Sequence, residues 1–174
     1  FRLGSLVWDR WFGIFGSIPN VAGTGILMLQ EQSGRSWGNW WGSSNSVPFM
    51  QYVLDEHYLQ RNPFVTSPSL RQIDRSGQWG LLPVSRILSH YSGYQSPAAG
   101  QPSQFTSACG TMIYRDNFLG ESLTGNLFVS EPVHNLIHRR VVNGNGIRKN
   151  TRKPPSEART EFLRSNDPWF RPTT

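Results

Sequence analysis

One stretch in the C-terminal third of the chain constrains the fold most, because it combines strand-like runs with strong stop signals. A short apolar run at residues 126–130 ends at Pro132, since proline has no amide hydrogen to donate to a sheet. A second β-prone run at 135–142 is followed by 143–146, Asn-Gly-Asn-Gly, which suits a tight hairpin turn. Residues 147–149 are the predicted returning strand. The stretch therefore predicts an antiparallel meander.

Two upstream stretches repeat part of this pattern. Residues 38–43 match 125–130 at Gly, Asn, two bulky apolar residues and the final Ser, and residues 11–17 match 37–43 in their Trp, bulky pair and Gly-Ser. Three degenerate copies at uneven spacing favour a propeller with loops inserted between its blades. The alternative is chance, since the chain holds 17 Gly and 7 Trp. We expect 39–42 and 126–130 to be antiparallel strands in different blades.

Composition is consistent with one globular domain. The chain has 174 residues, of which 16% are charged, and no apolar run is long enough to cross a membrane. It begins without Met or a signal-peptide pattern, so we expect an internal fragment of a longer protein. The predicted fold class is all-β: a partial β-propeller of two to four blades with long inserted loops, spanning residues 1–174.

Other elements are predicted from local pattern. The strand candidates are 26–29, 83–88 and 110–115, each short, apolar and flanked by turn residues. Residues 48–59 are richer in helix-tolerant side chains and predict a short helix or an inserted excursion. Residues 90–104 are rich in Ser, Gly, Pro and Gln and predict a long surface loop.

The C-terminal part carries most of the net charge of +6. Both lysines, Lys149 and Lys153, lie there among several arginines. Clustered cations can bind nucleic acid through counterion release, but no recognition helix, RNA-binding strand motif or zinc finger appears. We therefore expect no nucleic-acid partner, and we expect 149–160 to be a basic Pro-containing connector, exposed and without regular structure over 149–159.

The single cysteine, Cys109, excludes an internal disulfide framework. Small and apolar neighbours favour a buried core thiol. A nucleophilic role would need a nearby basic group that lowers the pKa of the thiol, and the local sequence offers none.

Acid–base candidates gather beside Pro132. His134 and His138 on one strand would lie about 13 Å apart, too far to share a metal, so no metal site is predicted. Glu131 and His134 are able to act as acid and base across a loop, with Asn135 beside them. A loop capped by ordinary hydrogen bonds explains the same residues equally well.

Several blocks of the sequence, in their order and spacing, resemble the membrane-bound dehydrogenase propeller family, the PVC-type β-propeller proteins. The blocks are 37–40, 44–46, 57–63, 105–110, 113–115, 125–139 and 161–172. The resemblance covers roughly residues 33–172.

The resemblance implies a propeller similar to quinoprotein sugar and aldose dehydrogenases. Those proteins often hold pyrroloquinoline quinone and Ca²⁺ over the central channel and pass electrons to a cytochrome c. Family members are typically exported, so the implied location is periplasmic or otherwise extracytoplasmic, with membrane association open. This chain lacks the Cys-x-x-Cys-His haem motif. It would then be part of a protein that oxidises a sugar or alcohol, and inactive as a fragment.

The resemblance also assigns site residues. It places Glu131, His134 and Asn135 on a loop between two blade strands near the channel mouth, with Glu131 and His134 as catalytic groups. Asn135, Arg115 and Arg86 are expected to hold the cofactor, since guanidinium binds carboxylates bidentately. The alternative is a non-catalytic propeller that binds carbohydrate or protein through its loops.

Overall fold

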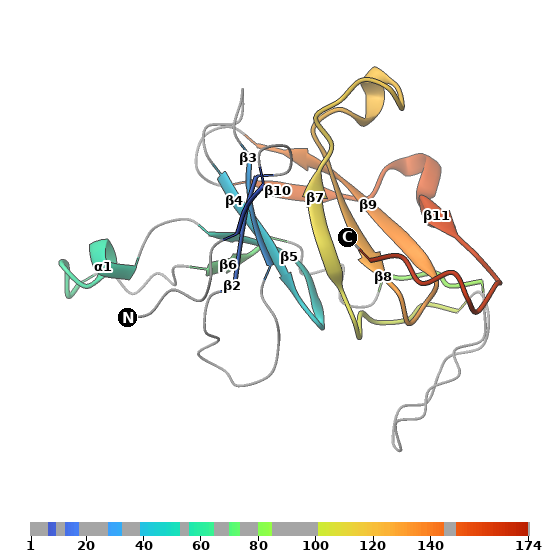
Figure 1. Ribbon diagram of the computed structural model, residues 1–174, viewed down its shortest axis with the longest axis horizontal. Coiled ribbons are helices and arrows are strands. Elements are labelled where there is room, and N and C mark those ends of the chain that lie inside the picture. The colour runs from blue at the N-terminus through green and yellow to red at the C-terminus, as the bar shows by residue number, and fades with distance from the viewer. Residues whose placement is uncertain are drawn as a thin grey trace, which may run out of the picture.

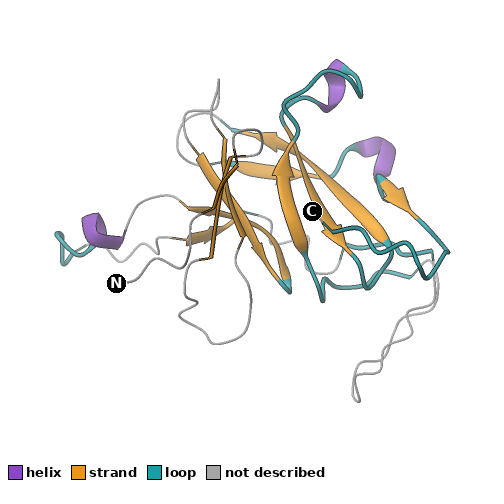
Figure 2. Ribbon diagram, in the orientation of Figure 1, coloured by secondary structure: helices purple, strands orange, loops and turns teal. Residues whose placement is uncertain are grey.

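The computed structural model is built almost entirely of antiparallel strands (Figures 1 and 2). It describes residues 7–9, 13–17, 28–32, 39–52, 56–64, 70–73, 80–84, 101–144 and 149–173. The only α-helix in these ranges is α1 (Glu56–Leu59), and two short 3₁₀ helices span Glu121–Leu123 and Pro155–Glu157. The predicted all-β class is confirmed.

The first sheet is a meander of six antiparallel strands in which every neighbour in space is also the neighbour in sequence. Its strands in order are β1 (Val7–Asp9), β2 (Gly13–Ser17), β3 (Met28–Gln32), β4 (Asn39–Ser44), β5 (Val47–Tyr52) and β6 (Leu70–Gln72). A two-residue turn joins β4 to β5, where Ser44 pairs with Val47.

The second sheet has the order β10-β9-β8-β7, with β11 also paired to β9. Its strands are β7 (Cys109–Ile113), β8 (Asn126–Glu131), β9 (Leu136–Asn143), β10 (Asn150–Arg152) and β11 (Leu163–Arg164). Figure 1 shows β7 beside β3 and β4 of the first sheet. No closed sheet is formed by the part of the chain that the structure describes.

The two strands predicted from the repeated pattern are present. Residues 39–42 lie in β4 and residues 126–130 lie in β8, both in antiparallel pairs and in different sheets. The prediction for 110–115 also holds approximately, since β7 covers 109–113. The returning strand of the meander starts later than predicted, because Asn150 pairs with Asn143. Residues 147 and 148 lie outside the described residues.

One local prediction is only partly right and another is wrong. Residues 48–59 predict a short helix or an inserted excursion, and Glu56–Leu59 do form α1, but residues 48–52 form most of β5, because pairing on both sides with β4 and β6 outweighs intrinsic propensity. The connector at 149–159 does contain regular structure, in β10 and in the 3₁₀ helix Pro155–Glu157, and Glu157 is buried. The free edge of β9 supplies hydrogen-bond partners that the local sequence does not reveal.

The remaining predicted segments are only partly described. Of the strand candidate at 83–88, residues 85–88 lie outside the described residues, as do 26 and 27 of the candidate at 26–29. Most of the predicted loop at 90–104 is also outside them. Ser103, at its end, is buried and forms an isolated bridge with Leu81.

The hydrophobic core is shared by the two sheets. Its most buried members are Trp41 and Phe49 from the first sheet, Leu127, Val129 and Leu136 from the second, and Leu81 and Phe105 from loops. β8 is buried along its whole length. Leu127 and Val129 face this core, whereas Phe128 packs against Phe162 at a ring-centroid distance of 4.9 Å. Burial on both faces explains the continuous apolar run in β8.

Candidate functional site

The turn between β8 and β9 is the point where the chemically active residues of the sequence meet. His134 N donates to the Glu131 carbonyl oxygen at 3.2 Å, and Asn135 N donates to the Pro132 carbonyl oxygen at 3.4 Å. Asn135 has a φ of 55°, in the left-handed region that asparagine tolerates better than most residues. The sequence Glu-Pro-Val-His-Asn thus closes the hairpin in a tight turn.

The Glu131 carboxylate is fully buried and receives three hydrogen bonds. Thr106 N and Ser107 N donate to Oε2 at 3.2 and 3.0 Å, and Thr106 Oγ1 donates to Oε1 at 3.2 Å. His134, also fully buried, has Nδ1 3.3 Å from Glu131 Oε1 and Nε2 2.7 Å from Ser103 Oγ. The carboxylate of Glu131, the imidazole of His134 and the hydroxyl of Ser103 therefore lie in a row in space.

This order is the one that activates a serine nucleophile in hydrolases. Here Ser103 is only 2% exposed, and its backbone exchanges hydrogen bonds of 2.8 and 3.2 Å with Leu81. A nucleophile must reach a substrate carbonyl, whereas this hydroxyl is enclosed within the fold. In the described structure the hydrogen bond between His134 Nε2 and Ser103 Oγ ties the hairpin turn to the segment around Ser103.

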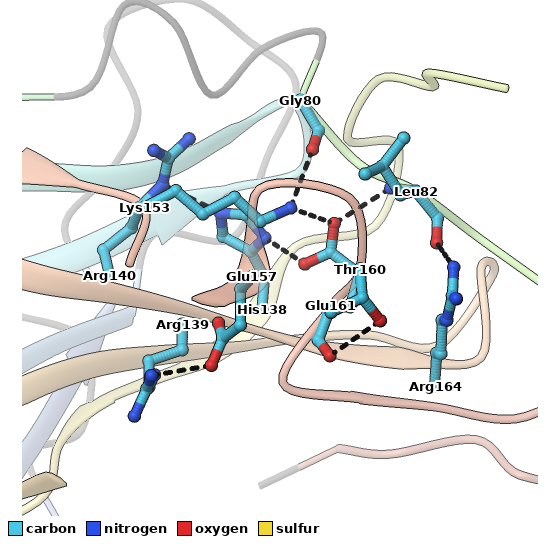
Figure 3. Close-up of polar contacts among 10 residues, drawn as sticks. All are labelled: Gly80, Leu82, His138, Arg139, Arg140, Lys153, Glu157, Thr160, Glu161 and Arg164. Carbon is cyan, nitrogen blue, oxygen red and sulfur yellow. Dashed lines mark hydrogen bonds and ion pairs between the residues drawn. The ribbon is translucent and has the colours of Figure 1, made fainter. Parts of the chain in front are cut away.

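A second buried network lies next to it, centred on Glu161 (Figure 3). His138 Nδ1 donates to Glu161 Oε2 at 2.5 Å, while Lys153 Nζ and Leu82 N donate to Oε1 at 2.8 and 2.9 Å. Arg140 Nε donates to His138 Nε2 at 2.9 Å, which fixes His138 as the neutral tautomer protonated on Nδ1. The carboxylate is thus saturated with donors.

The electrostatics agree with this assignment. Burial lowers the pKa of His138, and the charges of Arg140 and Lys153 lower it further, against the opposing effect of Glu161. Burial alone would raise the pKa of Glu161, but the hydrogen bonds from His138 and Lys153 and the charge of Lys153 hold this pKa below its ordinary value. The network therefore contains an ionised carboxylate and a neutral imidazole.

The C-terminal segment closes over the turn. Asn135 Nδ2 donates to the Phe170 carbonyl oxygen at 2.5 Å, and Arg171 Nη1 donates to the Pro132 carbonyl oxygen at 2.7 Å. Ser165 N donates to the Asn135 carbonyl oxygen at 2.9 Å. The side-chain amide nitrogen and the backbone carbonyl oxygen of Asn135 are therefore both bonded to this segment. Asn135 is 4% exposed.

The predicted site residues are only partly brought together. Glu131, His134 and Asn135 share one buried turn, so they do not line an open loop at a channel mouth within the described structure. Arg115 is exposed just beyond β7, near the other end of β8, because Ile113 pairs with Leu127. Four to five residues of strand separate these two ends, about 15 Å. Arg86 lies outside the described residues.

The described residues do not form a site for a quinone and Ca²⁺. Among them, no group of three or more His, Cys, Asp or Glu side chains is placed to hold a metal ion. Three cations of this region are already engaged: Arg171 with the Pro132 carbonyl oxygen, Arg140 with His138, and Lys153 with Glu161 and the Gly80 carbonyl oxygen. An anionic quinone needs free cations, which this network does not offer.

Cys109 begins β7 and is half-buried, less buried than the core position predicted for it. Burial raises the pKa of its thiol, and the negative charge of Glu131 raises it further. A raised pKa reduces the thiolate fraction, so the structure gives no support to a nucleophilic role.

Sequence reasoning missed five side chains of these networks: Ser103, Thr106, Arg140, Lys153 and Glu161. Ser103 ends a segment that predicts a surface loop, and Glu161 and Lys153 stand among charges that favoured a solvated connector. The one available signal was the block 161–172, whose resemblance to the propeller family pointed to a role beyond solvation.

Comparison with known proteins identifies one family. The model of the family described as Domain of unknown function (DUF7133) matches residues 29–174. No curated protein and no solved structure matches the chain. Within the described residues, no helix has the length and apolar character needed to span a membrane.

Proposed function

This chain belongs to the DUF7133 family, and we propose that it is a scaffold part of an extracytoplasmic, β-propeller dehydrogenase-like protein that oxidises a sugar or alcohol. The observation that carries the proposal is the arrangement of the repeated strands. β4 and β8 contain related sequences and lie in two successive antiparallel meanders that pack against each other. Successive blades of a propeller are built in this way.

In this proposal the chain supplies support and not the reacting groups. Glu131, His134 and Asn135 are buried and hydrogen-bonded, so their role is to hold the β8–β9 turn in place. Pyrroloquinoline quinone and Ca²⁺ would then be held by segments other than the described residues, and electrons would pass to a cytochrome c domain or partner. The proposed location is the periplasm or another extracytoplasmic compartment.

The test uses the full-length protein that contains this chain. Quinone and Ca²⁺ are added, and reduction of an electron-accepting dye is measured with a panel of sugars and alcohols. We expect quinone-dependent turnover from the full-length protein and none from residues 1–174 alone. Turnover without quinone, or none with any substrate and any quinone, contradicts the proposal.

The role of His134 is tested in the same assay with His134→Gln. A supporting residue predicts lower thermal stability with KM and kcat nearly unchanged at a temperature where the protein stays folded. A large loss of kcat with unchanged stability would instead make His134 a reacting group.

The second candidate is a non-catalytic propeller that binds a ligand or protein through its surface. It is favoured by one observation: the three residues nominated for chemistry in the β8–β9 turn are at most 4% exposed. A full-length protein that binds a partner but never reduces dye would support this alternative.

A further inference from the structure

A cavity of about 260 Å³ lies at the end of the β8–β9 hairpin that is remote from the buried turn. The residues that line it include Trp41 from β4, Asn126 from β8, Val141 and Val142 from β9, and Lys149 just before β10. Both sheets therefore contribute to its wall. Asn126 and Glu131 mark the two ends of β8, about 17 Å apart at the rise of a strand.

Two buried polar atoms of lining residues have no hydrogen-bond partner among the described residues. They are Trp41 Nε1, in a residue 1% exposed, and Asn126 Oδ1, in a residue 3% exposed. The orientation of the Asn126 amide is fixed, because its Nδ2 donates to the Ser122 carbonyl oxygen at 2.9 Å. The donor Trp41 Nε1 and the acceptor Asn126 Oδ1 are thus without a hydrogen-bond partner among the described residues. Buried groups of this kind normally have one.

The chemistry of these two atoms selects the ligand. Hydroxyl groups both accept and donate, so one hydroxyl of a polyol can accept from the indole N–H of Trp41 while an adjacent one donates to the amide oxygen of Asn126. A simple anion can only accept, so its charge would face the partly negative Asn126 Oδ1 without a proton to share. The Lys149 ammonium does not reverse this preference, since it already donates to the Gly144 carbonyl oxygen at 3.0 Å.

We propose that this cavity is a binding site for a small neutral polyol, with adjacent hydroxyls bonded to Trp41 Nε1 and Asn126 Oδ1. The side chains of Val141 and Val142 and the Trp41 ring offer apolar surface to the carbon atoms of such a ligand. The volume would hold roughly eight water molecules at about 30 Å³ each, which suits a molecule between glycerol and a single sugar residue.

This inference goes beyond the proposed function. Among the described residues that line the cavity there is no carboxylate, histidine or cysteine, so the proposal is one of binding alone. The proposed polyol site does not depend on whether the full-length protein is a dehydrogenase, because its test measures binding to this chain alone.

The experiment follows the indole N–H of Trp41 by ¹H–¹⁵N NMR of the whole chain. Its resonance is assigned from the signal lost in Trp41→Phe. The probes are glycerol, glucose, 1-propanol and propanoate, which represent a free polyol, a sugar, a single hydroxyl and an anion without a hydroxyl. We expect a saturable shift with glycerol or glucose, the stronger of the two identifying the source, and no saturable shift with 1-propanol or propanoate.

Variants then test the contacts through the backbone amide signals of Gly125 and Val142. Trp41→Phe keeps an aromatic ring but removes the donor, and we expect about tenfold weaker binding, the usual effect of one buried hydrogen bond. Trp169→Phe is the matched control, because Trp169 is 89% exposed and does not line the cavity, and it should leave affinity within about twofold. If Trp41→Phe does not fold, the comparison of glycerol with 1-propanol in the unaltered chain decides the matter.

Three results would overturn the proposal. They are no saturable shift with either polyol, an equal response to 1-propanol or propanoate, and unchanged affinity in folded Trp41→Phe. Each would mean that the cavity does not select a polyol through these two polar atoms.

Discussion

His138 donates its Nδ1 proton to Glu161 across 2.5 Å, and this bond joins β9 to a segment 23 residues further along the chain. The same imidazole ring packs against Phe105 and Phe49, with centroid distances of 5.4 and 6.2 Å. His138 thus lies where the apolar core shared by the two sheets meets the buried charge network. Predictions about stability follow most directly from this residue and its partner.

Glu161→Gln should destabilise the chain by about 3 kcal/mol. The substitution removes the charge while Lys153 remains largely buried beside it, and breaking a buried pair on one side leaves an uncompensated charge. Equilibrium unfolding in urea measures the loss. Glu121→Gln is the control, because Glu121 is exposed, and it should change stability by less than about 0.5 kcal/mol. A loss below about 1 kcal/mol for Glu161→Gln would show that the donors find other partners.

Stability should fall as the pH drops below about 6.5, the ordinary pKa of histidine. Since the folded-state pKa of His138 is lowered, the unfolded chain binds the proton first and acidification favours unfolding. One such group contributes a slope of up to about 1.4 kcal/mol per pH unit. The lowered pKa of Glu161 acts in the same direction at more acidic pH, because its stabilisation is lost as its carboxylate is protonated.

The contribution of His138 is isolated with His138→Gln, which cannot titrate. Urea unfolding between pH 7 and pH 5 should show a shallower pH dependence in this variant than in the unaltered chain. Identical slopes would indicate that folding does not lower the pKa of His138, and would contradict this prediction.

Asn135→Ala should loosen the C-terminal segment. It removes the hydrogen bond to the Phe170 carbonyl oxygen and places alanine at a φ of 55°, which costs roughly 1–2 kcal/mol for a residue with a Cβ. Asn135→Gly loses the hydrogen bond but accepts that φ, so it should be less destabilised. Limited proteolysis of the segment around 165–171 and urea unfolding measure both effects. Equal behaviour of the two variants would argue against backbone strain at this position.

Cys109 should react with iodoacetamide more slowly in the folded chain than after unfolding in urea at the same pH. Burial and the charge of Glu131 raise the pKa of its thiol, and the thiolate is the reactive form. Because the chain has a single cysteine, mass spectrometry reads the modification without ambiguity. Faster alkylation of the folded chain would contradict the assignment and reopen a nucleophilic role.

The most exposed aromatic residues are isolated from one another on the surface. Phe64, Phe118 and Trp169 are 87–90% exposed and lie in three separate loops. Isolated exposed apolar residues are common on soluble proteins and do not by themselves indicate a docking surface.

The sequence by itself determined the strand framework. Residues 126–131 and 136–143 form β8 and β9 because an apolar run, a proline stop and a second β-prone run leave an antiparallel hairpin as the simplest outcome. The repeated Gly-Asn-bulky-bulky pattern also located β4 correctly. Such signals are local, since turns and strand runs are encoded by neighbouring residues.

Only the tertiary structure decided which polar residues are buried together. Glu131 finds Thr106 and Ser107, and His138 finds Glu161, across sequence separations of about two dozen residues. Neither spacing nor composition distinguishes a buried carboxylate from a solvated one, because the difference depends on which donors other segments bring to it. For the same reason the sequence nominated Glu131 and His134 for chemistry, whereas packing encloses both within the fold.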